Sequence, residues 1–344
     1  MNRRTFLRSM LVGGSMASVV GVGGWLLGHR PRSADLVARN ECTGPSPTPA
    51  ATPHRYSPLP EARWPGHQPG RVYLGVSGST ASLDGYKCLL RAFRSYFDWE
   101  EPGDEDAAIR TSHRLGRLPW VSFKPPINAA QGWSQIAAGD HDDAIRARAR
   151  RYAAHAQPIV STFHHEPTNE PAGTGSDFAA AWTHIHDVML AESDLANVAF
   201  VPVIGSWEWN PKNVHADPDP YLTTDVLSRA AFLGLDVYEG ASGETFSDRM
   251  DLVLAWLDQR GYADLMVGIG EMGCTEQFSS TDAAQWWTDS WAWIEAHADR
   301  VGVVCYFNST ANSRESAYWP LDESQAKSDA FIKSLESPVV SAPL

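Results

Sequence analysis

Short apolar runs alternate with longer amphipathic segments along most of this chain. A run of Val, Ile, Thr and Phe bounded by turn residues is typical of a buried parallel strand. Eight such runs predict strands at residues 72–77, 93–97, 120–123, 159–164, 198–204, 232–237, 266–270 and 301–307. The pattern therefore predicts a protein organised around a buried parallel sheet.

The segments between these runs carry apolar residues at helical spacing, and Ser or Asp at several of their starts suits an N-cap. They predict helices at residues 83–91, 105–115, 142–155, 177–193, 221–229, 246–260, 281–297 and 323–335. Eight strand–helix repeats predict an α/β fold, a single-domain (β/α)8 TIM barrel. A doubly wound open sheet is the alternative, but the first strand is followed only by a weak GxxG spacing at Gly75 and Gly78.

Composition is ordinary for a soluble globular protein, with 43% hydrophobic and 20% charged residues among 344. The net charge of −13 argues against a nucleic-acid or anionic-membrane surface, because both need basic patches. We therefore expect no nucleic-acid partner. Fourteen Trp residues are many for this length, and several fall near predicted strand ends. Their flat apolar faces suit sugar rings, although packing in the core explains any one of them equally well.

The first 34 residues predict an export signal rather than part of the fold. Residues 2–8, NRRTFLR, form a twin-arginine signature, and an apolar, glycine-rich run covers residues 9–28. Because that run approaches the roughly 20 residues that span a bilayer, a cleaved signal and an uncleaved N-terminal anchor both remain open. Either way, we expect a protein exported by the twin-arginine route, and either secreted or held at the outer face of the cell membrane. Cys42 follows Arg39-Asn40-Glu41, which is not a lipobox.

Residues 35–70 are rich in Pro, Ser, Thr and Ala, a composition typical of an extended, solvated linker. The sequence thus predicts three parts: the signal or anchor at 1–34, a linker at 35–70, and a barrel domain at 71–340.

Four cysteines in an exported chain allow two disulfides in three possible pairings. Cys274 and Cys305 follow or end neighbouring predicted strands, so we expect them to lie within bonding distance. Cys42 and Cys88 would then form the second pair. Each pair has the alternative of remaining small buried thiols.

Two predicted strands end in a glutamate. The segment 158–169, PIVSTFHHEPTN, breaks from apolar to polar at His164, His165 and Glu166. The segment 264–276, DLMVGIGEMGCTE, repeats this pattern and reaches Glu271 where its strand should finish. In a barrel of this kind, residues at the carboxyl ends of strands point into the active site. The sequence therefore predicts that Glu166 and Glu271 form an acid/base pair.

At these residues the chain resembles glycoside hydrolase family 26, a clan A family that contains many β-mannanases. The matching motifs are His165-Glu166 with Asn169, Gly270-Glu271-Met272-Gly273, the segment 135–140 with Asp143, Trp209-Asn210-Pro211, and Asp236-Val237-Tyr238. They occur in the family's order over roughly residues 71–335. The eighth strand departs from the family pattern, because it ends in Tyr306-Phe307-Asn308 without the usual Trp.

The resemblance implies a (β/α)8 barrel and a retaining mechanism, in which the two carboxyl groups stand about 5 to 5.5 Å apart. Glu271 would be the nucleophile, kept ionised by a hydrogen bond from Tyr238. Glu166 would be the acid and then the base, with a pKa raised by burial and by the charge of Glu271. The substrate, a polysaccharide or oligosaccharide, would be bound by residues near these glutamates, and no cofactor or metal is implied. The candidates for binding are His165, Asn169, Tyr238, Asp236, Trp99, Trp207 and Trp209.

Two other classes of function deserve comparison. A metal-dependent hydrolase would use His164, His165, Asp236 and Glu271, but barrel amidohydrolases usually carry an HxH pair on their first strand. Here the HxH pair, His184-Ile185-His186, falls in a predicted helix, where residues two apart do not share a face. A carbohydrate-binding barrel without turnover is the other class, and retained binding without hydrolysis would identify it.

Overall fold

The computed structural model describes residues 56–99, 101–125, 132–169, 171–215, 217–240, 243–278, 282–311 and 317–344. The twin-arginine segment, the apolar run that follows it and Cys42 lie outside these residues. Within the described ranges, no helix is both long enough and apolar enough to span a bilayer.

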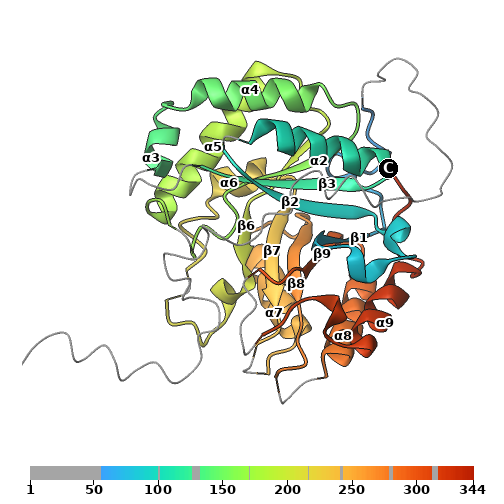
Figure 1. Cartoon of the computed structure of the whole chain (residues 1–344). Helices are drawn as coiled ribbons and strands as arrows, with labels where there is room; N and C mark the ends of the chain where they lie inside the picture. The colour runs from blue at the N-terminus through green and yellow to red at the C-terminus, as the bar shows by residue number, and fades with distance from the viewer. Residues whose placement is uncertain are drawn as a thin grey trace, which may run out of the picture.

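The core of the fold is a parallel sheet with the strand order β5-β4-β3-β2-β1-β9-β8-β7-β6 (Figure 1). The strands are β1 (Tyr73–Gly78), β2 (Ala92–Asp98), β3 (Leu118–Lys124), β4 (Ile159–Phe163), β5 (Val198–Phe200), β6 (Val203–Gly205), β7 (Leu233–Tyr238), β8 (Val267–Gly273) and β9 (Val301–Asn308). All eight predicted strands are therefore present at their predicted places.

The sheet closes into a ring because β5 and β6 are two halves of one strand. β5 pairs with β4, β6 pairs with β7, and only Val201 and Pro202 separate the two halves. Proline has no N–H to donate to a ladder, yet the Pro202 carbonyl still accepts a hydrogen bond from Gly234 N at 2.9 Å. The result is a (β/α)8 TIM barrel, as the sequence predicts.

Helices surround this barrel (Figure 1). They are α2 (Pro102–Arg114), α3 (Gly132–Ala137), α4 (Asp142–Ala153), α5 (Gly175–Glu192), α6 (Thr224–Arg229), α7 (Phe246–Gln259), α8 (Ala283–Ala296) and α9 (Gln325–Leu335). The predicted helix at 83–91 is wrong. Two short 3-10 turns, Ala81–Leu83 and Lys87–Leu89, stand there instead, because Gly85 between them adopts a left-handed φ of 90° that interrupts a helix.

The amino-terminal ends of the strands are closed by an apolar cluster, which we call the floor. It includes Trp64, Tyr73, Trp120, Phe232 and Val303. Trp64 is 3% exposed, and its ring centroid lies 5.1 Å from that of Phe232. Residues 56–70 therefore belong to the folded domain, which corrects the predicted linker boundary at residue 70. The proline-rich composition gave no sign that this segment is folded, because one buried side chain, that of Trp64, is enough to anchor it.

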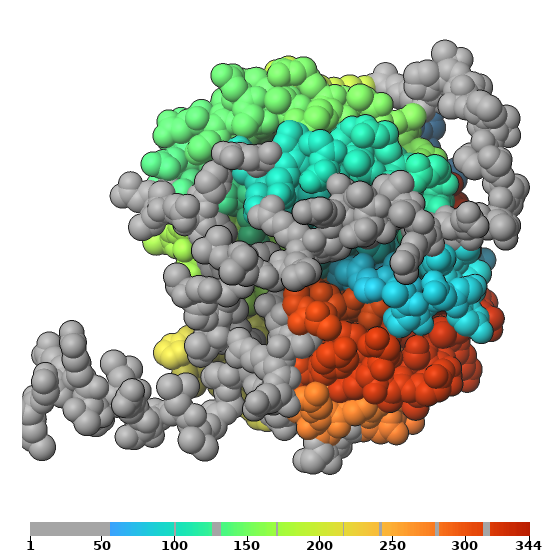
Figure 2. Space-filling model, in the orientation of Figure 1, coloured from blue at the N-terminus to red at the C-terminus, as the bar shows by residue number. Residues whose placement is uncertain are grey.

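Both ends of the described chain lie at the floor. Val72 forms a parallel bridge with Val340, and Leu344 N donates to Gly116 O at 3.1 Å. Leu344 also packs against the floor cluster. In the space-filling view, early residues (cyan) border the C-terminal part of the chain (red) (Figure 2), as expected from the pairing of β1 with β9.

The predicted disulfide between Cys274 and Cys305 is wrong, since both are free and buried thiols. Cys305 faces the inside of the barrel with the floor cluster, whereas Cys274 belongs to the outer layer between strands and helices, where Sγ lies 3.3 Å from Ala283 O. Two side chains on opposite faces of a sheet cannot bond. Cys88 is disulfide-bonded, and its predicted partner Cys42 lies outside the described residues.

Candidate active site

Glu166 stands on a strained turn at the carboxyl end of β4. His164 and Glu166 both have left-handed backbone angles, with φ of 44° and 50°, which is uncommon for residues other than glycine. Backbone hydrogen bonds to both neighbouring strands hold this turn, from His164 N to Phe123 O at 2.9 Å and from Glu166 N to Val203 O at 3.0 Å. The neighbouring strands therefore hold this strained backbone in place. The turn puts the carboxyl group of Glu166 at the mouth, which is the end of the barrel opposite the floor.

The side chains of His164 and His165 point in different directions, the first toward helix α3 and the second toward β2. The His164 side chain is fully buried, and its Nδ1 accepts a hydrogen bond of 2.9 Å from the indole Nε1 of Trp133 in α3. The ring of His165 instead lies 5.2 Å from that of Tyr96 on β2. This confirms the interpretation of His164 as a buried histidine, here hydrogen-bonded through Nδ1, and it separates two members of the alternative metal site.

A bulge in β8 aims Glu271 into the mouth. Val267, Ile269 and Met272 all face the outer core, and the pairing register shifts between Ile269 and Met272. Strict alternation from Ile269 would turn residue 271 outward, but an extra residue in a strand reverses the alternation from that point on. Glu271 consequently faces inward, opposite Asp236 of β7.

Each carboxylate oxygen of Glu271 accepts a hydrogen bond from a different tyrosine. Tyr96 OH lies 2.8 Å from Oε1, and Tyr238 OH lies 2.5 Å from Oε2. Burial, and next to it the negative charge of Glu271, raises the pKa of Tyr238 well above its ordinary value. Burial likewise raises the pKa of Tyr96. Both phenols thus keep their protons and donate them, and the predicted hydrogen bond from Tyr238 is present.

Arg94 of β2 carries positive charge inside the barrel beneath Glu271. Its Nη1 lies 2.7 Å from Asp236 Oδ1 and 3.7 Å from Glu271 Oε1, and its Nη2 donates to Ser122 Oγ at 3.3 Å. Burial alone would lower the pKa of Arg94, but Asp236, Tyr96 and Glu271 together outweigh the effect of burial and raise the pKa. The site is therefore a carboxylate supported by two phenols and a buried cation.

Asp236, a predicted sugar-binding residue, lies below the site rather than on its open surface. Its side chain is fully buried, and the carboxylate forms the ion pair with Arg94. Gly270 makes this pair possible, because a Cβ there would come within 2.1 Å of Arg94 Nη1 and 2.8 Å of Asp236 Oδ1. The geometry gives Asp236 the role of positioning Arg94.

Glu166 has the opposite electrostatic environment from Glu271. Burial, followed by the negative charge of Glu271, raises the pKa of Glu166 to about 7, although a hydrogen bond with Asn169 opposes the shift. A Cβ at Gly205 of β6 would lie 3.4 Å from Glu166 Oε1, and Gly205 pairs with Asp236, the residue opposite Glu271, so the two carboxyl groups lie at the same end of the barrel. Carboxyl groups with such contrasting environments are typical of an acid and its partner base or nucleophile.

His165 adds a neutral imidazole to the mouth. Burial, and after it the positive charges of Lys124 and Arg94, lowers the pKa of His165 well below its ordinary value. The side chain is 9% exposed, and its Nδ1 has no hydrogen-bond partner within the part of the chain that the structure describes. This nitrogen is itself buried, so His165 places an unpaired ring nitrogen just beneath the surface of the mouth.

The predicted tryptophans differ in their surroundings. Trp99 is 9% exposed and packs between Phe123 and His141, with ring centroids 5.7 Å from each. Trp209 packs against Trp256 of α7. Trp207 is partly exposed in the 3-10 turn Ser206–Trp209 that follows β6. Trp209 is also partly exposed, so Trp207 and Trp209 both keep some surface for a sugar platform, whereas Trp99 is almost entirely buried.

Sequence reasoning missed three residues of the site: Arg94, Tyr96 and Trp319. Arg94 and Tyr96 alternate within the predicted strand 93–97, and a polar pair at this spacing inside an apolar run signals an inward-facing polar layer. Trp319 comes from the loop after β9, is partly exposed, and packs on Tyr238 with ring centroids 4.7 Å apart. It brings an indole to the mouth although the eighth barrel strand ends without one.

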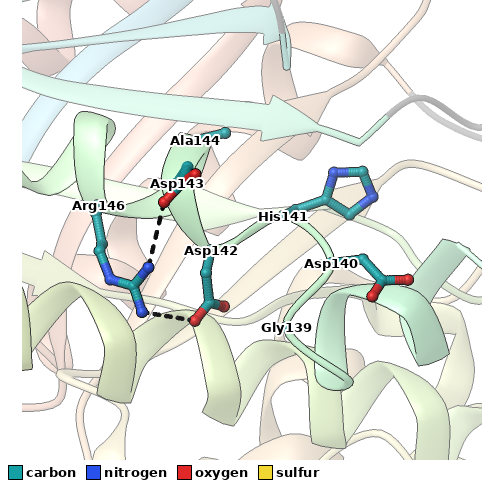
Figure 3. A pocket seen from close by; sticks show the side chains of 7 residues that line it. All are labelled: Gly139, Asp140, His141, Asp142, Asp143, Ala144 and Arg146. Atoms are coloured by element: carbon teal, nitrogen blue, oxygen red, sulfur yellow. Dashed lines mark hydrogen bonds and ion pairs between the residues drawn. The ribbon is translucent and has the colours of Figure 1, made fainter.

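A separate hollow of about 480 Å³ lies at the start of α4, lined by Gly139, Asp140, His141, Asp142, Asp143, Ala144 and Arg146 (Figure 3). Arg146 pairs there with Asp142 at 2.8 Å and with Asp143 at 3.4 Å. The hollow contains neither glutamate of the site, although its wall contacts Trp99 through His141. Across the described residues, no group of three or more His, Cys, Asp or Glu side chains has the arrangement of a metal site.

Comparisons with known proteins agree with this architecture. No family model and no curated protein sequence matches the chain. Several solved structures do match the chain. A glucosidase from Croceicoccus marinus has 14% sequence identity and a TM-score of 0.57, with 77% of this chain and 67% of that chain covered.

Two further structures are of the type that the sequence motifs indicate. GH26C from Muricauda sp. MAR_2010_75 has 12% identity and a TM-score of 0.52, over 79% of this chain and 87% of that one. A β-mannanase from a symbiotic protist of the termite Reticulitermes speratus, solved with a gluco-manno-oligosaccharide, has 13% identity and a TM-score of 0.51, over 79% and 88%. At these identities the similarity establishes the fold. In that fold the chain resembles glycoside hydrolase family 26 and other barrel glycosidases.

Proposed function

We propose that this protein is a retaining glycoside hydrolase that cleaves β-linked polysaccharide. The observation that carries the proposal is the contrast between the two glutamates. Glu271 accepts hydrogen bonds from Tyr96 and Tyr238, a setting that stabilises a carboxylate, whereas the pKa of Glu166 is raised to about 7 by burial and by the charge of Glu271. One group is prepared to attack and the other to give a proton.

In the first step, a Glu271 oxygen donates an electron pair to the anomeric carbon. The bond from that carbon to the leaving oxygen breaks, and the leaving oxygen takes the proton of Glu166. In the second step, Glu166, now ionised, removes a proton from water as the water attacks the anomeric carbon. The ester bond breaks, its electron pair returns to Glu271, and Glu166 is again protonated.

We propose a β-mannan or a related β-glycan as the substrate, cleaved with endo-β-mannanase-like action. A mannanase solved with gluco-manno-oligosaccharide shares this fold, and the strand-end motifs resemble those of family 26. Trp207 and Trp319 would offer faces to sugar rings. His165 and Asn169 would bind sugar hydroxyls close to Glu166.

Hydrolysis by the purified protein, screened on mannans, xylans, β-glucans and cell-wall glycans, tests this proposal. Glu271→Ala should lower hydrolysis by several orders of magnitude for every substrate, and azide should rescue it. Glu166→Ala should affect substrates with poor leaving groups most, and it should accumulate the glycosyl enzyme from an activated aryl glycoside. Full activity in both variants would place the site elsewhere. Polysaccharide binding without hydrolysis by the wild type would instead identify a binding barrel.

Export by the twin-arginine route is a second part of the proposal, with a secreted or membrane-held product. It rests on Arg3 and Arg4 ahead of the apolar run. Replacing both with Lys should leave the protein in the cytoplasm, as measured by cell fractionation. Unchanged export of that variant would mean that the pair is ordinary positive charge preceding a signal.

A further inference from the structure

Tyr96 belongs to none of the sequence motifs, and the two steps of the mechanism above give it no part beyond its hydrogen bond to resting Glu271. It comes from β2, two residues after Arg94, and its hydroxyl donates to Glu271 Oε1 at 2.8 Å. Glu271 itself comes from β8, which does not neighbour β2 in the sheet. The contact therefore crosses the mouth of the barrel.

We propose that Tyr96 is a catalytic residue that holds the Glu271 carboxylate through the covalent intermediate and stabilises it as the leaving group of the second step. This inference rests on the proposed glycosidase function. Its basis is that Tyr96 and Tyr238 take one carboxylate oxygen each.

The division of the two oxygens has a direct chemical consequence. When one oxygen of Glu271 bonds to the anomeric carbon, it loses its negative charge and its partner phenol is released. The other oxygen becomes the ester carbonyl oxygen and keeps its own phenol. In this proposal Oε2, the oxygen bound by Tyr238, is therefore the attacking atom, so that Tyr96 keeps its bond to Oε1 and fixes the orientation of the ester.

The same geometry predicts which step depends more on Tyr96. Charge leaves the carboxylate during attack on the sugar, so a donor to Glu271 gains little strength in that transition state. Charge returns when water attacks the anomeric carbon and the ester bond breaks with its electron pair going to Glu271. A hydrogen bond to a charged acceptor is the stronger kind, so Tyr96 accelerates mainly the second step.

The Tyr96 ring is held in place before any substrate binds. The Arg94 guanidinium carbon lies 5.1 Å from the ring centroid, and the ring of His165 lies 5.2 Å away. Arg94 is in turn fixed by its ion pair with Asp236. The phenol therefore reaches Glu271 in a set orientation, which is what stabilisation of a developing charge requires.

The test is Tyr96→Phe in the full chain, assayed by pre-steady-state kinetics on an activated aryl glycoside that the wild type accepts. We expect kcat to fall about 10- to 100-fold, the range for one hydrogen bond to a charged group, with a smaller fall in kcat/KM. A burst of released aglycone should appear, because the glycosyl enzyme accumulates. Tyr73→Phe is the matched control, since it removes a buried phenol that donates to Gly66 O at 2.7 Å in the floor, and it should leave the kinetics unchanged.

A readout without turnover accompanies the kinetics. The hydroxyl proton of Tyr96 should give a downfield proton NMR resonance that is absent in Tyr96→Phe and shifted in Glu271→Gln. If the wild type hydrolyses a glycoside while Tyr96→Phe matches Tyr73→Phe, the inference is overturned and the proposed function stands. If the wild type hydrolyses nothing in the panel, the proposed function fails, and the role of Tyr96 fails with it.

Discussion

Trp133 donates its indole N–H to His164 Nδ1 across 2.9 Å, and this bond ties helix α3 to the strained turn that bears Glu166. Both side chains are fully buried. His164 keeps a left-handed φ of 44°, a conformation that persists only where the surrounding contacts hold it. The position of the proposed acid thus depends on a residue that never approaches the mouth.

Trp133→Phe should therefore weaken both stability and catalysis. Loss of the indole leaves a buried acceptor without its donor and a small cavity, which should lower the free energy of unfolding by about 2 to 4 kcal/mol. Because the turn loosens, hydrolysis of substrates with poor leaving groups should fall more than hydrolysis of activated ones. Urea denaturation and steady-state kinetics with both substrate types measure the two effects.

Trp287→Phe is the matched control for this variant. Its indole N–H donates to Ser334 Oγ at 3.0 Å between α8 and α9, in an equally buried place. We expect a similar loss of stability with unchanged kinetics. Equal catalytic losses in the two variants would mean that Trp133 acts only through general stability.

The pH dependence of activity should report the proton on Glu166. Since the pKa of Glu166 is raised to about 7, the protonated acid is lost as the pH rises through that value. For a substrate with a poor leaving group, kcat/KM should fall above pH of about 7. An activated aryl glycoside needs little protonation, so its kcat/KM should persist at higher pH. Basic limbs of equal size for both substrates would contradict the assignment.

Stability should show the same titration with a defined sign. The ordinary pKa of Glu166 is 4.5 and its folded value is about 7, so the folded state binds the proton more tightly than the unfolded state. The stability linked to this proton is fully present below pH of about 4.5 and is lost as the pH rises through about 7. Glu166→Gln removes the titration, so its unfolding free energy relative to wild type should rise across this interval. A difference that stays constant with pH would argue against a raised pKa.

Gly270→Ala should disrupt the buried pair beneath the site. The new Cβ would stand 2.1 Å from Arg94 Nη1, so the guanidinium must move and leave Asp236 without its partner. We expect a loss of about 3 kcal/mol or more and a large loss of activity, measured by urea denaturation and turnover. Gly103→Ala is the control, because a Cβ at Gly103 in α2 meets no atom within 4 Å, and it should change stability by no more than about 1 kcal/mol.

The strands were predictable from sequence because their apolar runs are short and bounded by turn residues. All eight appear where the pattern placed them, and Glu166 and Glu271 stand at two of their carboxyl ends. The floor was not predictable. Trp64 lies in a proline-rich stretch, and only the tertiary contact with Phe232 shows that it is buried.

The detailed arrangement of the site depends on two irregularities that no periodicity reveals. The bulge in β8 turns Glu271 inward against the alternation of Val267 and Ile269. The left-handed φ of Glu166 is set by hydrogen bonds to residues distant in the sequence. Tyr96 is a different case, because the alternation of Arg94 and Tyr96 inside an apolar strand was visible and its meaning became clear only beside Glu271.

The floor also decides how this molecule can be handled. Trp64 and Leu344 both pack at the amino-terminal ends of the strands, while Glu166 and Glu271 open at the opposite end. A resin, sensor chip or fusion partner attached to either end of the described chain would hold the protein by its floor side, with the mouth facing away from the support. Long polymers in the surrounding liquid would then reach the glutamates without crossing the support.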